Sequence, residues 1–234
     1  ISIVNSGPAP YTGLTMTDDL GAYTYDTGTL TPLTYVDGSL RYFVNGVLQA
    51  TPTPTADAPL TVPGIAVPAG GNALLIYETR VNSFAPLDTE STVTNTATLS
   101  GAGLTTPVQA ASTVNARAAA YLTIGKAVSP ATVAENGTLT YTFTIQNYGN
   151  TAAAETDNVT VSDTFSPILK AISVTYNGVA WTEGTQYTYN TATGAFATTA
   201  GQITVPAASL TRDAATGAVV VTPGISTLTV TGTV

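Results

Sequence analysis

Apolar and polar residues alternate along much of this chain, in short segments separated by turn residues. In the segment 159–165, Val159, Val161 and Phe165 would share one face of an extended strand, with Ser and Thr on the other. Gly, Pro, Asn and Asp gather between such segments, as in NSG, DGS, NGV and PAGG. No long segment carries Leu, Glu, Lys and Ala at helical spacing. The pattern predicts an all-β protein of Ig-like sandwiches with Greek-key connections, although the same spacing would suit two barrels.

An internal repeat organises these segments. Five short stretches recur later in the chain in the same order. The matched pairs are 1–7 with 143–149, 14–20 with 159–165, 42–47 with 174–179, 65–69 with 203–207, and 73–81 with 226–234. The repeat predicts two tandem domains, at residues 1–117 and 118–234.

The two copies begin and end at different points of the repeat. The second copy opens with YLTIGKAVSPATVAENGTLTYT, which has no counterpart before Ile1. The first copy closes with residues 82–112, which have no counterpart after Val234. We therefore expect the first domain to lack its first strand and the second domain to lack its last strands.

Four polar residues interrupt otherwise apolar strand faces. Lys126 follows Leu122 and Ile124 in alternation, and Asp163 lies between Val161 and Phe165. Asp18 interrupts the face of Leu14, Met16 and Leu20, and Asn95 interrupts the face of Val93, Ala97 and Leu99. A buried charge without a partner is very costly, so these side chains should meet other polar groups.

Composition narrows the functional classes. The net charge is −8 with a pI of about 4.1, which disfavours nucleic acid and anionic membrane surfaces as partners. Histidine and cysteine are absent, so neither His-based catalysis, a Cys nucleophile, the usual zinc sites nor a disulfide is available. No apolar stretch reaches the length of a membrane span. A Thr-rich, acidic β protein with few charges suits the exterior of a bacterial cell, and we expect no cofactor and no metal.

One reaction needs a lysine, a carboxyl group and an asparagine together. Burial disfavours the charged form of an amine, and a neutral lysine amine can attack an asparagine carboxamide. A neighbouring carboxyl group can polarise the carboxamide and move protons. The product is a Lys–Asn isopeptide bond, which would tie together the first and last strands of a domain much as a disulfide would.

The motifs LTIGKAVSPATVAENGTLTYTFTIQNYGN, VTVSDTF and STVTNTATLS resemble the bacterial surface repeat filed as domain of unknown function eleven. That family is similar to the Ig-like, isopeptide-bonded modules of Gram-positive adhesins and pilins. The resemblance implies that Lys126 is the lysine, Asn95 the acceptor, and Asp163 and Asp18 the assisting carboxyl groups. Neither copy contains a complete triad, because copy one lacks the lysine strand and copy two lacks the asparagine strand.

Simpler structural roles remain open for all four residues. Lys126 could snorkel or pair with Asp163, both aspartates could cap the turns after them, and Asn95 could satisfy backbone groups.

Three functions follow from the sequence. The first is a structural subunit of an extracellular filament or surface stalk, which would be a head-to-tail homopolymer and no enzyme beyond autocatalytic bond formation. The missing strands of copy two could then come either from a continuation of the same chain or from a neighbouring subunit that donates a strand. The second is an adhesin or carbohydrate-binding module with a surface glycan or host ligand. The third is an accessory domain of a larger secreted enzyme.

Overall fold

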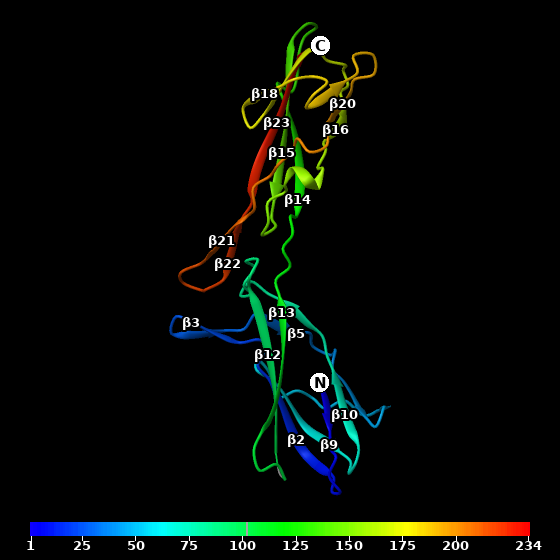
Figure 1. Ribbon diagram of the computed structural model, residues 1–234, viewed down its shortest axis with the longest axis vertical. Helices are drawn as coiled ribbons and strands as arrows, with labels where there is room; N and C mark the ends of the chain where they lie inside the picture. Colours follow the sequence, from blue (N-terminus) through cyan, green and yellow to red (C-terminus); the bar gives the residue numbers. More distant parts are fainter. Residues whose placement is uncertain (102) are drawn as a thin grey trace. The chain divides into compact units, whose positions relative to one another are not determined.

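The computed structural model describes residues 1–101 and 103–234 (Figure 1). The prediction of an all-β protein is confirmed, since antiparallel sheets make up almost all the regular structure of these residues. The helical element in the described part is η1 (Glu155–Asp157), a single 3₁₀ turn. The chain divides into two compact units. Unit 1 contains Ile1–Ala116 and Arg212–Val220, and unit 2 contains Arg117–Thr211 and Val221–Val234.

Unit 1 contains two larger sheets, with strand orders β1-β10-β6-β7 and β13-β12-β2-β9-β8. Two short pairs, β11-β5 and β3-β4, complete its first 116 residues. The strands are β1 (Ser2–Val4), β2 (Tyr11–Asp18), β3 (Tyr23–Tyr25), β4 (Gly28–Leu30), β5 (Leu33–Tyr35), β6 (Arg41–Val44), β7 (Val47–Leu48), β8 (Ala56–Asp57), β9 (Leu60–Val67), β10 (Asn72–Ile76), β11 (Thr79–Val81), β12 (Thr92–Ser100) and β13 (Val108–Asn115).

The core of unit 1 is shared by both large sheets. Leu14 and Met16 of β2 pack with Ile65 of β9, and Tyr42 of β6 and Leu75 of β10 join them from the other sheet. The alternation in β2 predicted this face correctly, because Leu14, Met16 and Leu20 are all buried.

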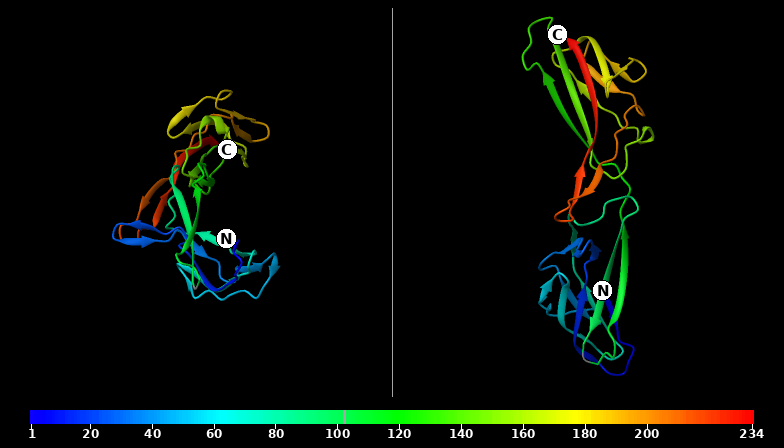
Figure 2. Two further views of the ribbon diagram at one scale, coloured as in Figure 1. Left: turned by 60° about the horizontal axis from the view of Figure 1, so that its bottom comes forward. Right: turned by 90° about the vertical axis from the view of Figure 1, so that its left-hand side faces the viewer.

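Unit 2 repeats one of these sheets and part of the other. Its five-stranded sheet has the order β14-β15-β23-β17-β18, and its second sheet contains only β16-β20-β19. Figure 2 shows β14, β15 and β23 side by side, in green and red. The strands are β14 (Leu122–Ser129), β15 (Thr138–Asn147), β16 (Ser162–Thr164), β17 (Lys170–Tyr176), β18 (Val179–Trp181), β19 (Tyr187–Tyr189), β20 (Ala195–Thr198), β21 (Ser209–Arg212), β22 (Val219–Thr222) and β23 (Gly224–Thr233).

The core of unit 2 confirms the inward face of β16 and corrects that of β14. Val161, Phe165 and Ile203 are buried, as the alternation predicts. Ile124 and Val128 share the face of Lys126, yet they are 56% and 44% exposed. The alternation identified their common face, and Lys126 on that face reaches Asp163 of the second sheet, but the side chains of Ile124 and Val128 remain largely open to solvent. Strand alternation reports which side chains share a face, and burial requires a partner layer for that face.

Equivalent residues make equivalent contacts in the two units. The side chain of Asn5 donates to the carbonyl of Pro68, and that of Asn147 donates to the carbonyl of Pro206, both at 3.0 Å. Ser2 pairs with Leu74 of β10, and its counterpart Thr144 pairs with Thr227 of β23. These pairs match the repeat in register, so the sequence repeat is a repeat of structure.

One hairpin departs from the alignment of the repeat. Tyr42 lies opposite Leu75, and Tyr176 lies opposite Leu228, the counterpart of Leu75. Tyr42 donates to the carbonyl of Ala66 and Tyr176 to that of Thr204, at 2.8 and 2.7 Å. Tyr42 and Tyr176 are therefore structural equivalents, although the Asn-Gly match had aligned them two residues apart.

A late segment of the chain belongs to unit 1. Arg212, the last residue of β21, lies against the rings of Tyr23 and Tyr25, with its guanidinium carbon 5.4 and 5.0 Å from their centroids. The guanidinium also donates to the carbonyl of Gly217 at 2.8 Å. This contact lies within unit 1 and explains why Arg212–Val220 groups with residues far earlier in the sequence.

Candidate functional site: two partial lysine–carboxyl–asparagine sets

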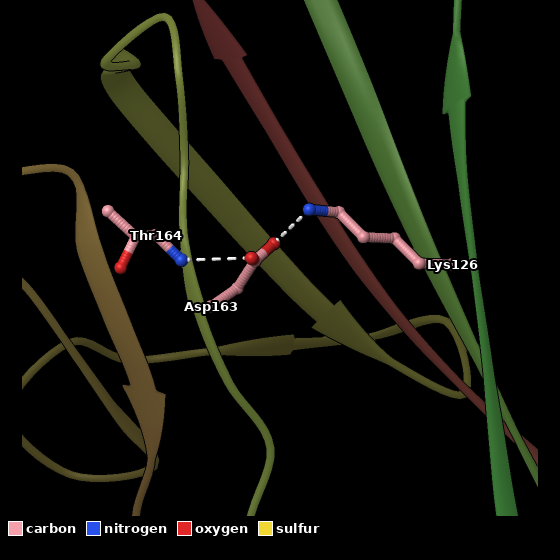
Figure 3. Close-up of polar contacts among 3 residues, drawn as sticks. All are labelled: Lys126, Asp163 and Thr164. Carbon is pink, nitrogen blue, oxygen red and sulfur yellow. Dashed lines mark hydrogen bonds and ion pairs between the residues drawn. The ribbon is translucent and has the colours of Figure 1, made fainter.

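In unit 2, Lys126 and Asp163 come together as an ion pair. Lys126 extends from β14, and Nζ contacts Oδ2 of Asp163 on β16, across the two sheets (Figure 3). Oδ1 of Asp163 accepts a hydrogen bond from the backbone amide of Thr164 at 2.9 Å. The side chain of Asp163 is 18% exposed and that of Lys126 is 42% exposed. The pair is therefore sheltered on the side of the carboxylate and open on the side of the amine.

Aromatic rings surround the amine of Lys126. Nζ lies 4.8 Å from the ring centroid of Tyr141 and 5.7 Å from those of Phe143 and Phe165. The π faces of these rings attract the cation and exclude water from one side of it. The arrangement fixes the amine at the inner face of the sheet, which is where the alternation in β14 placed it.

In unit 1, Asp18 is completely buried and accepts three hydrogen bonds. Oδ1 accepts from the backbone amide of Leu20 at 2.8 Å. Oδ2 accepts from the side-chain amide of Asn95 at 3.0 Å and from the hydroxyl of Tyr77. The alternative role of Asp18 as a turn cap is thus present on Oδ1, and Oδ2 contacts Asn95.

Only one of the two polar groups in the side-chain amide of Asn95 has a hydrogen-bond partner. Nδ2 donates to Asp18, while Oδ1 is buried and has no hydrogen-bond partner within the described residues. A buried acceptor without a donor costs about 1–3 kcal/mol. An incoming N–H donor at this point would therefore be stabilised by Asn95 as well as by Asp18.

Tyr77 is the residue that the sequence analysis missed. Burial, followed by the hydrogen bond to Asp18, raises the pKa of Tyr77 far above the ordinary range for tyrosine. The signal was available in the run ALLIYE, where Ala73, Leu75 and Tyr77 alternate on the inward face. A tyrosine at the end of an apolar face requires a partner for its hydroxyl, and a buried carboxylate on the facing strand provides one.

The two units thus hold complementary parts of the predicted triad. Unit 1 brings Asp18 and Asn95 together, and unit 2 brings Lys126 and Asp163 together. Lys126 and Asn95 themselves belong to different units.

The sheet topology accounts for both partial sets. In unit 1, β2 lies between β12 and β9, so Asp18 pairs with Ala97 on one side and Leu60 on the other. In unit 2, Asp163 of β16 pairs only with Phe196 of β20, and its other edge is unpaired in the described ranges. The position that β12 occupies beside Asp18 is therefore open beside Asp163.

In unit 1 the unpaired edge is that of β1, in the other large sheet. In unit 2, β14 pairs with β15 along its full length, and Lys126 lies opposite Phe143. The counterpart of β15 in unit 1 is β1, which pairs with β10 on one edge. No strand of residues 1–101 or 103–234 pairs with its other edge.

In the part of the chain that the structure describes, no group of three Asp, Glu, His or Cys side chains is placed to hold a metal ion. None of the helical structure in that part is long and apolar enough to cross a membrane.

Comparison with protein-family models gave no match, and comparisons with curated proteins and with solved structures gave none either.

Proposed function

We propose that this chain is a structural subunit of an extracellular bacterial filament or surface stalk. Its units are Ig-like β-sandwiches that are assembled head to tail by strand donation and joined by Lys–Asn isopeptide bonds. One observation carries the proposal: each unit holds a different part of a lysine–carboxyl–asparagine set, and each has an open strand edge at the missing part.

The chemistry proceeds from the ion pair. Lys126 gives a proton to Asp163, and the neutral amine attacks the side-chain carbonyl carbon of an asparagine on the incoming strand. The C–Nδ2 bond breaks after the new C–Nζ bond has formed. Protonated Asp163 donates its proton to the leaving nitrogen, which departs as ammonia, and the attacking nitrogen gives up its surplus proton, which the ammonia carries away as ammonium. The carboxylate is regenerated, so the reaction consumes no cofactor and no external oxidant.

The surroundings of Lys126 suit this proton transfer. The rings of Tyr141, Phe143 and Phe165 lie around Nζ and hold the amine beside the carboxylate. Asp163 contacts the amine directly, so the proton moves within an existing contact.

Strand donation places the acceptor. A strand that pairs with the free edge of β16 would occupy the position that β12 has beside β2 in unit 1. Its asparagine would then lie by Asp163 as Asn95 lies by Asp18, at 3.0 Å. A strand donated from another subunit in this manner makes a head-to-tail contact, and such contacts extend into filaments when they do not close.

The proposal is tested by assembly followed by denaturation. Purified protein is concentrated, examined by electron microscopy, boiled in detergent and separated by size. We expect filaments of the parent protein to leave a ladder of covalent multimers. Lys126→Arg keeps the charge and much of the length of the side chain but removes the nucleophilic amine, so it should assemble and yet dissociate on boiling. A parent protein that remains monomeric under all conditions would contradict the proposal.

A further inference from the structure

The open edge of β1 in unit 1 has the features of a docking site for one kind of strand. The equivalent edge in unit 2 is covered by β14, so the repeat itself shows which contacts a strand makes there. Two residues of unit 1 keep the features that make these contacts in unit 2, and a third residue, which lies on β12, adds a contact of its own.

The first is Asn5, the counterpart of Asn147. Each donates through Nδ2 to backbone carbonyls, which for Asn5 are those of Ala9 at 2.8 Å and Pro68 at 3.0 Å, with a longer contact to Val67 at 3.5 Å. Each also accepts through Oδ1 from the amide two residues later, at 2.9 Å.

One bond distinguishes the two asparagines. Oδ1 of Asn147 accepts a second bond at 2.9 Å, from the backbone amide of Tyr121, immediately before β14. Among the described residues, Oδ1 of Asn5 has only the bond from Gly7. Asn5 is thus already oriented to hold the start of a strand.

The second is Gly7, the counterpart of Gly149. A Cβ atom on Gly149 would overlap the backbone of Ala119, Ala120 and Tyr121, which passes directly over it. A Cβ atom on Gly7 would meet only Oδ1 of Asn5, at 3.2 Å, within the described structure. The backbone of Gly7 does not have a positive φ angle, so its conformation does not require glycine. The absence of a side chain at Gly7 is explained by a strand that passes over it, as one does over Gly149.

The third is Asn95 with its buried, unpartnered Oδ1 beside the carboxylate of Asp18. In unit 2, Lys126 lies opposite Phe143, and the counterpart of Phe143 in unit 1 is Ile1. A lysine opposite Ile1 would reach Asp18 as Lys126 reaches Asp163. Its ammonium group would supply the donor that Asn95 lacks and a positive charge for the buried carboxylate.

An apolar groove lies between these polar anchors. Ile1 and Ile3 of the β1 edge form one wall, and Met16, Leu99 and Leu104 contribute to the rest. In the register of unit 2, Ile124 lies opposite Ile145 and Leu122 opposite Asn147. Side chains of this kind would lie opposite Ile3 and Asn5, over the groove.

We propose that unit 1 docks an extended polypeptide segment of the β14 pattern along the free edge of β1. The segment runs antiparallel to β1, places two apolar side chains in the groove, hydrogen-bonds to Asn5 and presents a lysine to Asp18 and Asn95. The inference deepens the proposed function, because this site would accept a lysine strand as unit 2 would accept an asparagine strand.

A synthetic peptide tests the docking separately from the cross-link. The probe is the segment 119–130 with a fluorophore at its C-terminal end, titrated into the whole chain and followed by fluorescence anisotropy and hydrogen exchange. We expect saturable binding, with protection of residues 2–7. A peptide with Lys126→Ala should bind at least about tenfold more weakly, because Asp18 and Asn95 then lose their partner.

Two variants of the protein serve as matched controls. Gly7→Val should abolish binding without lowering the melting temperature, because its side chain projects into the path of the strand. Gly28→Val, on β4, should leave binding unchanged.

Saturable binding that survives Gly7→Val, equal binding of the alanine peptide, or no binding at all would overturn the inference. If the peptide binds but protein and peptide keep their separate, unmodified masses after denaturation, the docking site is supported and the isopeptide chemistry is contradicted. If the protein forms covalent ladders but does not bind the peptide, the isopeptide chemistry is supported and the docking site is contradicted.

Discussion

The amide nitrogen of Asn95 lies 3.0 Å from Oδ2 of Asp18, although 77 residues separate them in the sequence. The pairing of β12 with β2 brings the two side chains to one inner face, where Tyr77 reaches the same carboxylate oxygen. The corresponding aspartate of unit 2 contacts Lys126 instead. The equivalent aspartates of the two repeats thus have different partners, an asparagine in unit 1 and a lysine in unit 2.

The two aspartates should differ in their contribution to stability. Asp18→Asn should destabilise unit 1 by about 3 kcal/mol, because it replaces a buried carboxylate that accepts three hydrogen bonds by an amide with donors of its own. Asp163→Asn should cost less than about 1 kcal/mol, because its partner Lys126 is 42% exposed and the pair is screened by water.

Chemical denaturation followed by hydrogen exchange measures the loss of stability in each structural unit separately, for Asp18→Asn in unit 1 and for Asp163→Asn in unit 2. The single Trp181 gives an independent fluorescence signal for unit 2. High salt should weaken the effect of Asp163→Asn and leave that of Asp18→Asn nearly unchanged. Equal costs for the two variants would contradict the difference in burial on which this prediction depends.

Tyr77 should make unit 1 sensitive to alkaline pH. Its pKa in the folded protein is raised by burial and by the hydrogen bond to Asp18. Its contribution to stability is therefore complete below about pH 10, the ordinary tyrosine pKa, and is lost as the pH rises further, because the unfolded chain ionises first.

Tyr77→Phe isolates this contribution. At neutral pH the variant should lose about 2 kcal/mol, the contribution of a hydrogen bond to a charged group. The difference in unfolding free energy between parent and variant should shrink as the pH rises from 9 to 11. Burial also raises the pKa of Tyr176 and Tyr187, but both are present in parent and variant. A difference that stays constant over this pH range would show that Tyr77 is not coupled to folding.

Gly149 and Gly7 provide a matched pair of substitutions in the unassembled protein. Gly149→Ala should destabilise the start of β14 by about 1–3 kcal/mol, since the new methyl group overlaps the backbone of Ala119 and Tyr121. Gly7→Ala should change stability by less than about 0.5 kcal/mol. Faster exchange of the Tyr121 amide in Gly149→Ala is the expected signature. A large loss of stability in Gly7→Ala would mean that Gly7 serves the fold of unit 1 itself.

The sequence was sufficient for some features because they depend on local alternation and on the repeat. Period-2 alternation placed Asp18 and Asp163 on inward faces, and the repeat placed Asn5 and Asn147 in the same role. Lys126 was predicted to share a face with Ile124, and it does. The exposure of that face was not predictable from β14 alone, because burial depends on a facing strand from elsewhere.

Other features required the three-dimensional structure. The contact of Arg212 with Tyr23 and Tyr25 joins residues from the two ends of the chain, and no periodicity reports it. The hydrogen bond from Tyr77 to Asp18 depends on two sheets facing each other at one register. The two-residue shift between Tyr42 and Tyr176 was hidden because the Asn-Gly turns offered a stronger sequence match than the tyrosines.

The intact mass of assembled protein under denaturing conditions tests the central claim most directly. Each isopeptide bond releases one ammonia, so covalent multimers should weigh less than the sum of their chains by one ammonia for each bond. Lys126→Arg should restore the full mass of the separate chain. Assembled material that yields only single chains of unmodified mass would contradict the account.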